Sequence, residues 1–515
     1  MNNQSKPKSK WSWRLLRWGL ISLAVLATLA AVLITEENWR GKHEWKAYQR
    51  AAEARGEHLD TSWIVPPPVP DDQNFFAAPV VAEAMRAERR ENTVASPQSA
   101  TNAVDGLKLE MYRGDSARWP DIGGNWQKRT LTDLKPWQTY FREFSQSPEG
   151  RTNGFPIAAQ PQAPAADVLL ALSEFNPAIE ALRQAAQRPQ ARLPLAYEKG
   201  LEDIGNLLPW LSIEKRWIRV LQLRTLAELQ AGQSQPALED IKLSLRLADT
   251  LRGQPFFISH LVRVAMVAIT IQPIYEGIAG QRWNSAQLAD LDTALAAEDF
   301  LADYQRAMRG ERTCALASIE TMRATREMTS SAGENGNEIV TNSLRWTPSA
   351  FFYQSELAFA EKYDRFILPL ANPTNRTISL ATYRAGEKDF QTHQFSPYKI
   401  LERMAFPSVS KAISKFAQAQ THVDLARVVC ALERRRLAHG DYPDTLDPLA
   451  PELIPSLPHD IVNGQPLHYR RTNDGGYVLY SVGWNESDDG GTVVSDKKGR
   501  IDYEKGDWVW QLPAQ

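Results

Sequence analysis

One uncharged apolar run near the N-terminus limits what this chain can fold into more than any other feature. Residues 18–35 read WGLISLAVLATLAAVLIT, eighteen residues without a charge. At about 1.5 Å per residue, a helix of this length spans roughly 27 Å, close to the hydrocarbon core of a bilayer. Leu15 and Leu16 extend the run, because Arg17 can snorkel to the headgroups. We therefore expect a transmembrane helix over residues 15–35, with the lipid bilayer as its partner.

The charges on either side of this run predict its direction. Glu36 and Glu37 follow it, and five basic residues with no acidic one lie at or before its start: Lys6, Lys8, Lys10, Arg14 and Arg17. Positive flanks stay in the cytoplasm. Residues 1–14 are therefore expected to be a cytoplasmic tail. The protein would be a single-pass protein of the inner (cytoplasmic) membrane, with its C-terminal bulk on the extracytoplasmic side.

A cleaved signal peptide is the alternative interpretation of the same run. The small residues around Ala30 offer a weak cleavage site. The apolar run continues four residues past Ala30, which is longer than a usual signal core. The sequence therefore favours the uncleaved anchor.

Composition and charge argue against several classes of function. The net charge of −2 gives no reason to expect nucleic acid as a partner. The sequence contains no Gly-x-x-x-x-Gly-Lys-Ser/Thr loop, so no nucleotide is expected. It also lacks a Gly-x-Ser-x-Gly elbow and a His-Glu-x-x-His pair, two common signatures of hydrolases. We therefore expect a protein without enzyme activity.

The only two cysteines, Cys314 and Cys430, are too few for a disulfide framework or a four-cysteine zinc site. Both fall on apolar faces of predicted helices. The favoured interpretation is two small buried hydrophobic side chains. A disulfide between them stays possible in an oxidising compartment.

At 515 residues the chain exceeds one typical core, so several domains are expected. Residues 36–164 are interpreted as a stalk and irregular region, and residues 165–328 as a helical-hairpin domain. Residues 329–407 are interpreted as a linker and irregular helical region. Residues 408–515 form a C-terminal α+β module. The predicted fold class is mainly α.

Breaker residues and caps place the helices of the hairpin domain. Gly232 is expected to end one helix and Pro236 to open the next. Asn284 with Gln287 resembles a capping box. Residues 256–274 are the most apolar internal stretch, and they include His260 among other polar residues. Because polar side chains inside a span are costly, we expect a buried core helix here rather than a second span.

The C-terminal module shows a helix followed by a β-hairpin. Residues 408–439 predict one long amphipathic helix, ended by Gly440. Its apolar stripe is formed by Ile413, Phe416, Val423, Ala426, Cys430 and Leu437. Residues 467–472 and 477–482 predict two strands around the turn Asn-Asp-Gly-Gly. One face of the second strand is expected to cover the helix stripe.

This order of elements resembles the C-terminal half of the major pseudopilin of type II secretion systems. The residues that carry the resemblance are LERRRLAHGDYPDTLDPL, DIVNGQPLHYRR and YVLYSVGWNESDDGG. They cover about a hundred residues, and the chain as a whole resembles uncharacterised bacterial membrane-anchored proteins with helical bodies. The resemblance implies a structural subunit without catalytic activity, related to secretion.

The resemblance also implies a metal site in the acidic loop after the second strand, because that loop binds calcium in the family. The positions carried over are Asn485, Ser487, Asp488 and Asp489. Carboxylate and carbonyl oxygens are ligands that calcium prefers. A plain solvated acidic turn is the other interpretation of the same residues.

Taken together, these patterns predict a membrane-anchored envelope protein that acts as a scaffold or interaction protein, with other envelope proteins as partners. The alternative is an extracytoplasmic enzyme whose site is built from dispersed carboxylates. A deep apolar cleft with convergent acids would favour that enzyme. A flat exposed apolar patch would favour the scaffold.

Overall fold

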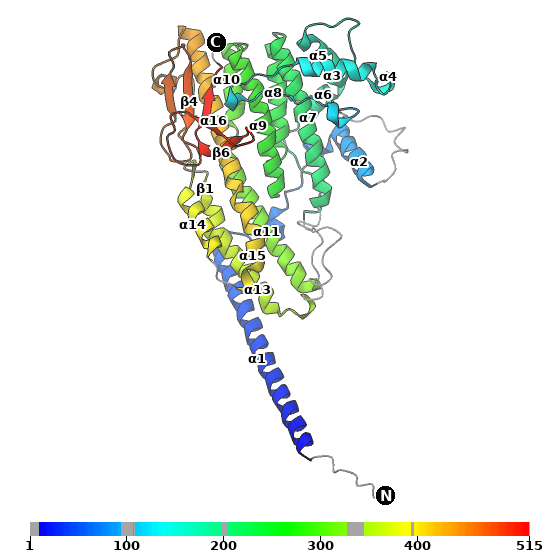
Figure 1. Ribbon diagram of the computed structural model, residues 1–515, viewed down its shortest axis with the longest axis vertical. Coiled ribbons are helices and arrows are strands. Elements are labelled where there is room, and N and C mark those ends of the chain that lie inside the picture. The colour runs from blue at the N-terminus through cyan, green and yellow to red at the C-terminus, as the bar shows by residue number, and fades with distance from the viewer. Residues whose placement is uncertain are drawn as a thin grey trace, which may run out of the picture. The chain divides into compact units, whose positions relative to one another are not determined.

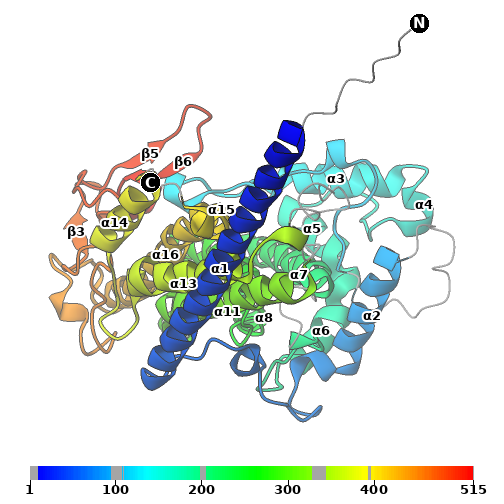
Figure 2. The same ribbon diagram turned by 90° about the horizontal axis from the view of Figure 1, so that it is seen from below.

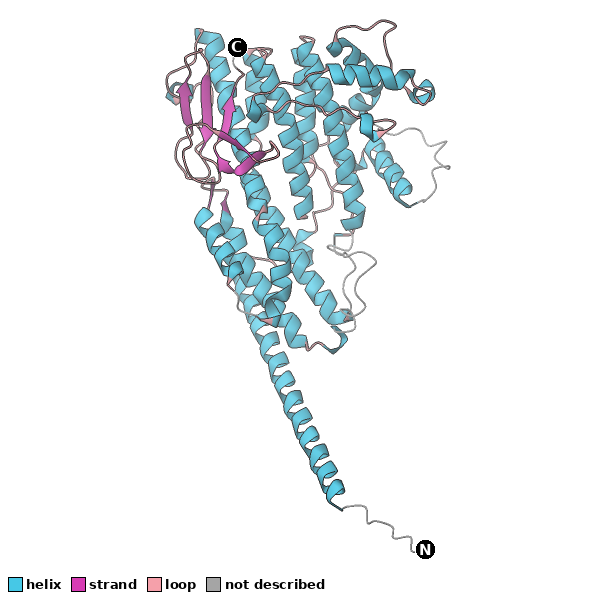
Figure 3. Cartoon of the chain, in the orientation of Figure 1, coloured by secondary structure: helices cyan, strands magenta, loops and turns pink. Residues whose placement is uncertain are grey.

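The computed structural model is mainly helical, with 63% of residues in helices and 7% in strands, as the sequence predicts. It describes residues 10–93, 107, 109–197, 204–326, 344–392 and 396–513. Of the predicted linker and irregular region over 329–407, residues 329–343 and 393–395 lie outside the described residues. Figure 3 shows the larger strands gathered in one region, next to helices.

The chain divides into two compact units. Unit 1 consists of residues 1–60, 312–363 and 392–406, and unit 2 of residues 61–311, 364–391 and 407–515. Helix α11 (Phe300–Thr325) contributes residues to both. Each unit is thus built from three separate segments, whereas the ranges expected from the sequence are contiguous. Those ranges remain predictions about how the chain is organised.

In unit 1 the apolar run belongs to one continuous helix, α1 (Lys10–Ala54). The expected span and the charged segment after it are therefore a single element. Helix α13 (Ser349–Lys362) packs along the C-terminal part of α1 (Figure 1 and Figure 2). The two backbones approach closely at Gly41, where a Cβ atom would lie 3.4 Å from the Cβ atom of Tyr353.

Unit 1 also contains η9 (Pro397–Lys399) and the start of α15 (Ile400–Ser410). Tyr398 of η9 contacts the ring of Phe351 on α13, with 6.5 Å between centroids. Lys362 pairs with Glu402 at 3.1 Å, and both side chains are buried. These contacts join the three segments of the unit.

Four helices form the centre of unit 2: α7 (Ile204–Gln230), α8 (Ser234–Asp249), α9 (Phe257–Ala279) and α10 (Ser285–Ala296). Figure 1 shows α7, α8 and α9 side by side, and the three helices contact one another. Gly232 has a φ of +77° in the turn between α7 and α8, as a helix-ending glycine should. The capping box predicted from Asn284 and Gln287 is present at the start of α10. These helix boundaries are confirmed.

Helix α9 is long and apolar enough to cross a membrane, and 56% of its most apolar window is buried inside the structure. It packs against α7, α8 and α16 (Ala412–His439). The polar residues of the run, His260, Arg263 and Gln272, are all buried and hydrogen-bonded to other segments of the chain. This environment is the one expected for a core helix.

Helix α16 differs from the amphipathic helix predicted over residues 408–439. It begins at Ala412, because residues 408–410 belong to α15. Nearly every residue from Phe416 to Glu433 is buried, so the helix has no solvent face there. Leu437, predicted to be in the apolar stripe, is 46% exposed. The reason is that α9, α10 and the C-terminal sheet pack around α16 from different sides.

The predicted hairpin is confirmed. Strands β3 (His468–Arg471) and β4 (Tyr477–Ser481) are antiparallel, with His468 opposite Tyr480, and β7 (Trp508–Gln511) pairs with β4 on its other edge. All five β4 residues are buried. Tyr477 packs on Tyr442, 4.7 Å away, near the end of α16. Val478 and Tyr480 pack with Val509 on the opposite face. Both faces of β4 are therefore covered, rather than one.

The remaining elements of unit 2 surround this centre. Before α7 lie η1 (Thr61–Ile64), η2 (Phe75–Ala77), α2 (Pro79–Thr93), η3 (Ser116–Arg118), η4 (Trp126–Lys128), α3 (Lys135–Gln146), α4 (Gly150–Asn153), α5 (Pro164–Leu172), η5 (Ser173–Phe175) and α6 (Asn176–Ala185). After α13 come η7 (Tyr363–Ile367), η8 (Leu368–Leu370), β1 (Ala371–Asn372), β2 (Thr377–Ile378), α14 (Leu380–Gln391), η10 (Asp447–Leu449), β5 (Val493–Ser495) and β6 (Ile501–Gly506).

Candidate functional site

The first candidate site is the surface of α1. From Trp13 to Ile34 its apolar side chains are exposed, with Leu26 63% and Leu33 64% accessible. None of its most apolar window is buried inside the described structure. An exposed apolar surface of this size is rare on a protein that is surrounded by water. The helix is compatible with a single-pass membrane anchor or a signal sequence.

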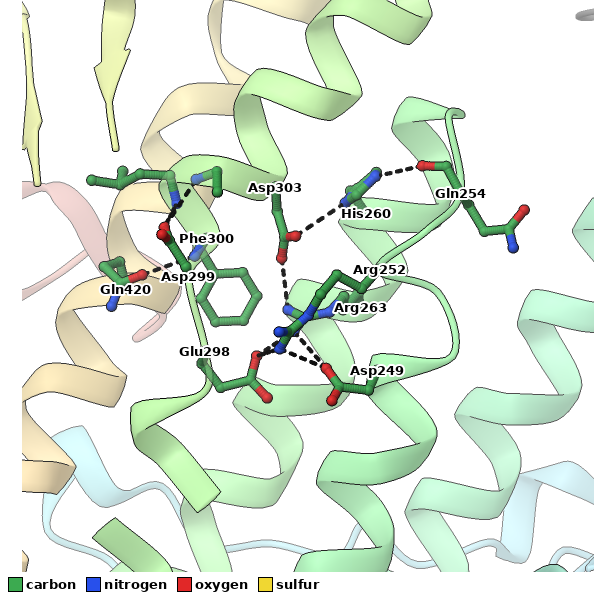
Figure 4. Close-up of polar contacts among 12 residues, drawn as sticks. Asp249, Arg252, Gln254, His260, Arg263, Glu298, Asp299, Phe300, Asp303 and Gln420 are labelled. Carbon is green, nitrogen blue, oxygen red and sulfur yellow. Dashed lines mark hydrogen bonds and ion pairs between the residues drawn. The ribbon is translucent and has the colours of Figure 1, made fainter. Parts of the chain in front are cut away.

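The second candidate site is a buried charge network in unit 2, centred on Arg263 of α9 (Figure 4). The Arg263 guanidinium lies 3.0 Å from an oxygen of Asp249, the last residue of α8, and 2.8 Å from an oxygen of Asp303 on α11. It also donates a hydrogen bond to Glu298, in the loop between α10 and α11. Three carboxylates therefore converge on Arg263, and Arg252 also pairs with Asp249 at 2.6 Å and with Glu298 at 3.2 Å.

Local structure holds these partners in place. Asp299 caps the start of α11, because its carboxylate accepts hydrogen bonds from the backbone N–H groups of Leu301 and Ala302 at 3.1 and 2.9 Å. Gln420 of α16 accepts a hydrogen bond from the Phe300 N–H at 2.8 Å. The ring of Phe300 lies 4.9 Å from the Arg263 guanidinium carbon. The network is thereby fixed to both α11 and α16.

Burial and charge oppose each other in this network. Burial raises the pKa of Asp303 to about 6, although Arg263 lowers it. Burial also raises the pKa of Glu298, although the charge of Arg263 lowers it. For Arg263 burial would lower the pKa, but the attraction of the three carboxylates outweighs it and the pKa is raised. Arg263 therefore stays charged, and its charge holds the carboxylates together.

His260 lies one turn before Arg263, next to the network. Its Nε2 atom donates a hydrogen bond to the backbone carbonyl of Gln254 at 2.7 Å, because a carbonyl oxygen only accepts. Its Nδ1 atom lies 4.0 Å from a carboxylate oxygen of Asp303. Burial lowers the pKa of His260 to about 3, so the ring is neutral at physiological pH. A neutral histidine with this geometry positions the loop between α8 and α9.

The centre of the network is closed to a substrate in this conformation, whereas Asp249 and Arg252 at its edge are 28% and 35% exposed. The side chains of Arg263, Glu298 and Asp303 are 0%, 2% and 4% exposed. A general acid or base needs to come within hydrogen-bond reach of a bound substrate. Convergent acids that are sealed and neutralised by an arginine match a structural role better than a catalytic one.

Two open cavities lie elsewhere in unit 2. One, of about 280 Å³, lies between the proline-rich residues 63–69, Arg192, Arg306 and the loop that carries Gly253. The other, of about 420 Å³, lies between η4 and strands β5 and β7. Among the described residues that line them, neither cavity has an Asp or a Glu. Neither of these two cavities therefore combines a cleft with convergent acids, the arrangement that would favour an enzyme.

The acidic loop predicted to bind calcium is held by hydrogen bonds within the protein. Asp488 accepts hydrogen bonds from the Tyr480 hydroxyl and the Gly490 N–H, both at 2.9 Å, and these bonds lower its pKa. Asp489 accepts one from the side chain of Asn485 at 2.9 Å. The side-chain carbonyl oxygen of Asn485 in turn accepts a hydrogen bond from the Ser487 N–H at 3.1 Å. The structure thus brings Asn485 and Asp489 together, whereas Asp488 is turned toward the sheet.

In the described part of the chain no three His, Cys, Asp or Glu residues are grouped so as to hold a metal ion. The loop side chains are engaged with one another and with the sheet, so they do not form a ready set of oxygen ligands. Calcium binding by this loop stays a prediction from the resemblance.

Asp507 organises the acidic loop, and it was not among the site residues predicted from the sequence. Its carboxylate accepts hydrogen bonds from the N–H groups of Gly491, Thr492 and Asp489 at 2.7, 3.1 and 3.3 Å. Asp507 is buried, and burial raises its pKa, although these three hydrogen bonds lower it. The sequence offered one weak signal, a charged residue next to the apolar strand that starts at Trp508.

The two cysteines are both buried, as the favoured interpretation predicts. Cys430 is a free thiol in the middle of α16, and burial raises its pKa well above the ordinary value. A thiol in that state is unreactive. Cys430 therefore behaves as a small core side chain.

Comparison of the chain with protein-family models, with curated proteins and with solved structures gives no match. The functional argument therefore rests on the physical features described above.

Proposed function

We propose that this protein is a single-pass membrane protein in which α1 crosses the bilayer and the rest of the chain serves as a non-catalytic scaffold for other envelope proteins. The observation that carries the proposal is the continuous exposed apolar surface of α1. In water this surface would cost about 25 cal/mol for each Å² left unburied, a cost that the bilayer interior removes.

The proposed orientation places the N-terminus in the cytoplasm. It is supported by the basic residues up to Arg17 and by Glu36 and Glu37 after the span. Trp18 and Trp39, 67% and 68% exposed, flank the run at its two ends. Tryptophan prefers the two membrane interfaces, which matches an apolar span that ends near these residues.

An uncleaved anchor is proposed in preference to a cleaved signal peptide. Cleavage after Ala30 would leave Val32, Leu33 and Ile34 as an exposed apolar end on a helix that continues to Ala54. A signal peptide has an apolar region of about 7–15 residues, which is shorter than the eighteen-residue run here. In this protein the residues after the run are helical without a break.

The scaffold part of the proposal is supported by the Arg263 network, which joins α8, α9 and α11 and buries Arg263, Glu298 and Asp303 away from a substrate. The resemblance of residues 408–515 to pseudopilins, and with it a role in secretion, is a further part of the proposal. The rival, an enzyme built from dispersed carboxylates, would need these acids to become accessible in another conformation.

The membrane part of the proposal is tested by extracting cell membranes with alkaline carbonate and measuring the intact mass of the protein. The proposal predicts that the full-length mass stays in the pellet. A soluble product that lacks the first thirty or so residues would show a cleaved signal peptide instead. The scaffold part is tested by crosslinking intact membranes and identifying the captured proteins, with membranes that lack the protein as the control.

A further inference from the structure

Trp346 is 89% exposed, more than any other large apolar side chain in the described part of the chain. It lies in a helical turn just before α13 in unit 1. The surrounding backbone is held firmly, because Arg326 donates hydrogen bonds to the Thr347 carbonyl at 2.6 Å and to the Ser349 hydroxyl at 2.9 Å. The exposed indole therefore projects from a turn whose backbone is held by hydrogen bonds.

The contacts between α13 and α1 show in which direction this turn points. The Asn38 side chain accepts a hydrogen bond from the Ala350 N–H at 2.6 Å. Farther along both helices, Glu44 accepts one from the Gln354 side chain, also at 2.6 Å. Because the residue numbers rise together, α13 runs parallel to α1 (Figure 1). The N-terminal end of α13 is thus the end nearer the apolar run of α1.

This register places Trp346 at the level where the apolar run ends. Thr35 lies three residues before Asn38, which is about 4.5 Å along a helix. Trp346 lies four residues before Ala350, a distance that at most about 13 Å of chain can span. Trp39 of α1, also exposed, lies at the same level. Two exposed tryptophans from separate segments of unit 1 therefore lie within about 13 Å of chain from the contact between Asn38 and Ala350, near the end of the apolar run.

We propose that the turn over residues 344–349 rests on the surface of the phospholipid bilayer beside α1, with the Trp346 indole inserted among the headgroups. This proposal rests on the proposed membrane anchor. Its occupant is lipid, because the turn continues the apolar surface of α1 at the depth where indole rings are most stable. A single span can tilt and rotate, whereas interfacial tryptophans on a second segment fix both. The turn therefore fixes the tilt and the rotation of unit 1 relative to the membrane.

The test uses the full-length chain in vesicles of phosphatidylcholine and phosphatidylglycerol. An environment-sensitive fluorophore is attached to one introduced cysteine at a time: Leu26→Cys inside the span, Arg345→Cys beside Trp346, and Glu53→Cys near the far end of α1. All three positions are exposed. The native cysteines are buried, so the unmutated chain treated in the same way gives the background. Quenching is measured with lipids that carry a nitroxide in the headgroup or deep in the acyl chain.

The proposal predicts that the headgroup nitroxide quenches the Arg345 reporter about threefold more than the Glu53 reporter, as expected for a site at the interface. Adding Trp346→Ser should lower that quenching toward the Glu53 value, whereas Trp119→Ser, at an exposed tryptophan of unit 2, should not. If the Leu26 reporter is quenched by the acyl-chain nitroxide but the Arg345 reporter matches Glu53, this inference is wrong and the anchor stands. If the Leu26 reporter is not quenched, the anchor itself is wrong, and the inference fails with it.

Discussion

Arg263 and Asp303 form an ion pair at 2.8 Å between α9 and α11, and both side chains are buried. Glu298 and Asp249 complete the set of acids around the same guanidinium. A buried pair of this kind contributes little net stability compared with a well-packed apolar pair, but the loss of one partner is costly. The first prediction follows from that asymmetry.

Arg263→Met leaves Asp303 without its cation, whereas Arg252 still pairs with Asp249 and Glu298. We expect the free energy of unfolding to fall by about 3–5 kcal/mol, because an uncompensated buried charge is strongly unfavourable. The measurement is a urea titration of the detergent-solubilised chain followed by circular dichroism. Arg306→Met, at an exposed arginine on α11, is the matched control and should change stability by less than about 0.5 kcal/mol. Equal losses in the two variants would show that the network has no special role.

Glu214 predicts a pH dependence of stability. It is fully buried on α7 and accepts a hydrogen bond from the Thr250 hydroxyl at 2.7 Å. Burial raises its pKa to about 8. Because the folded pKa lies above the unfolded value, the folded state binds more protons between these two values. Stability should therefore fall as the pH rises from about 4.5 to 8, by at most about 1.4 kcal/mol per pH unit from this group.

Glu214→Gln keeps the neutral hydrogen-bonding side chain and removes the titration. We expect this variant to lose part of the pH dependence between about 4.5 and 8 and to be more stable than the parent at pH 9. Glu180→Gln, at an exposed glutamate, is the control. The measurement is the urea midpoint as a function of pH. Identical pH profiles for the parent and Glu214→Gln would contradict the assignment.

Gly310 allows α11 to pass close to the loop between α8 and α9. A Cβ atom at Gly310 would lie 1.8 Å from the carbonyl oxygen of Pro255, a backbone atom that cannot move aside alone. We expect Gly310→Ala to destabilise the protein by about 1–3 kcal/mol through overpacking. Gly253→Ala in the same loop is the control, because its nearest neighbour would be the Ala191 carbonyl oxygen at 4.0 Å. A melting curve of each variant measures the difference, and equal midpoints would reject the prediction.

Asp507 predicts how the acidic loop is held. Asp507→Ala removes the acceptor of three backbone N–H groups, and we expect a loss of about 1–3 kcal/mol in stability. Melting curves of the parent and of this variant measure the loss, and equal midpoints would contradict the role given to Asp507.

Melting curves of the parent chain with calcium and with chelator test the predicted metal site. Calcium bound only by the folded state would add about 2.7 kcal/mol at a hundredfold excess over Kd. Equal midpoints across millimolar calcium would reject the site, and loss of a calcium shift in Asp489→Ala would assign it to this loop.

The sequence predicted the elements whose signals are local. The capping box at Asn284, the glycine turn at Gly232 and the hairpin between β3 and β4 each depend on residues a few positions apart. Such patterns act through backbone hydrogen bonds within the same segment, so one sequence is sufficient to identify them.

The sequence did not predict the features that depend on distant segments. The amphipathic helix predicted over residues 408–439 implies a solvent face, but the polar residues of α16 are buried: Gln420, His422 and Asp424 form hydrogen bonds with Phe300, Gln127 and Arg376. Helical periodicity shows which residues share a face, and does not show how many neighbours cover the helix. The Arg263 network was missed for the same reason, although polar residues within the apolar run were its visible signal. Trp346 offered no signal, because exposure depends on the folded chain.

The membrane topology is tested most directly by labelling single cysteines from the two sides of the membrane. Ser5→Cys and Glu53→Cys are treated with a membrane-impermeant maleimide in intact spheroplasts and in inverted vesicles. The proposed topology predicts that Glu53→Cys reacts in spheroplasts and Ser5→Cys only in inverted vesicles, because α1 separates the two sites. Reaction of both positions from the same side, or recovery of the labelled protein in the soluble fraction, would contradict the proposal that α1 spans the bilayer.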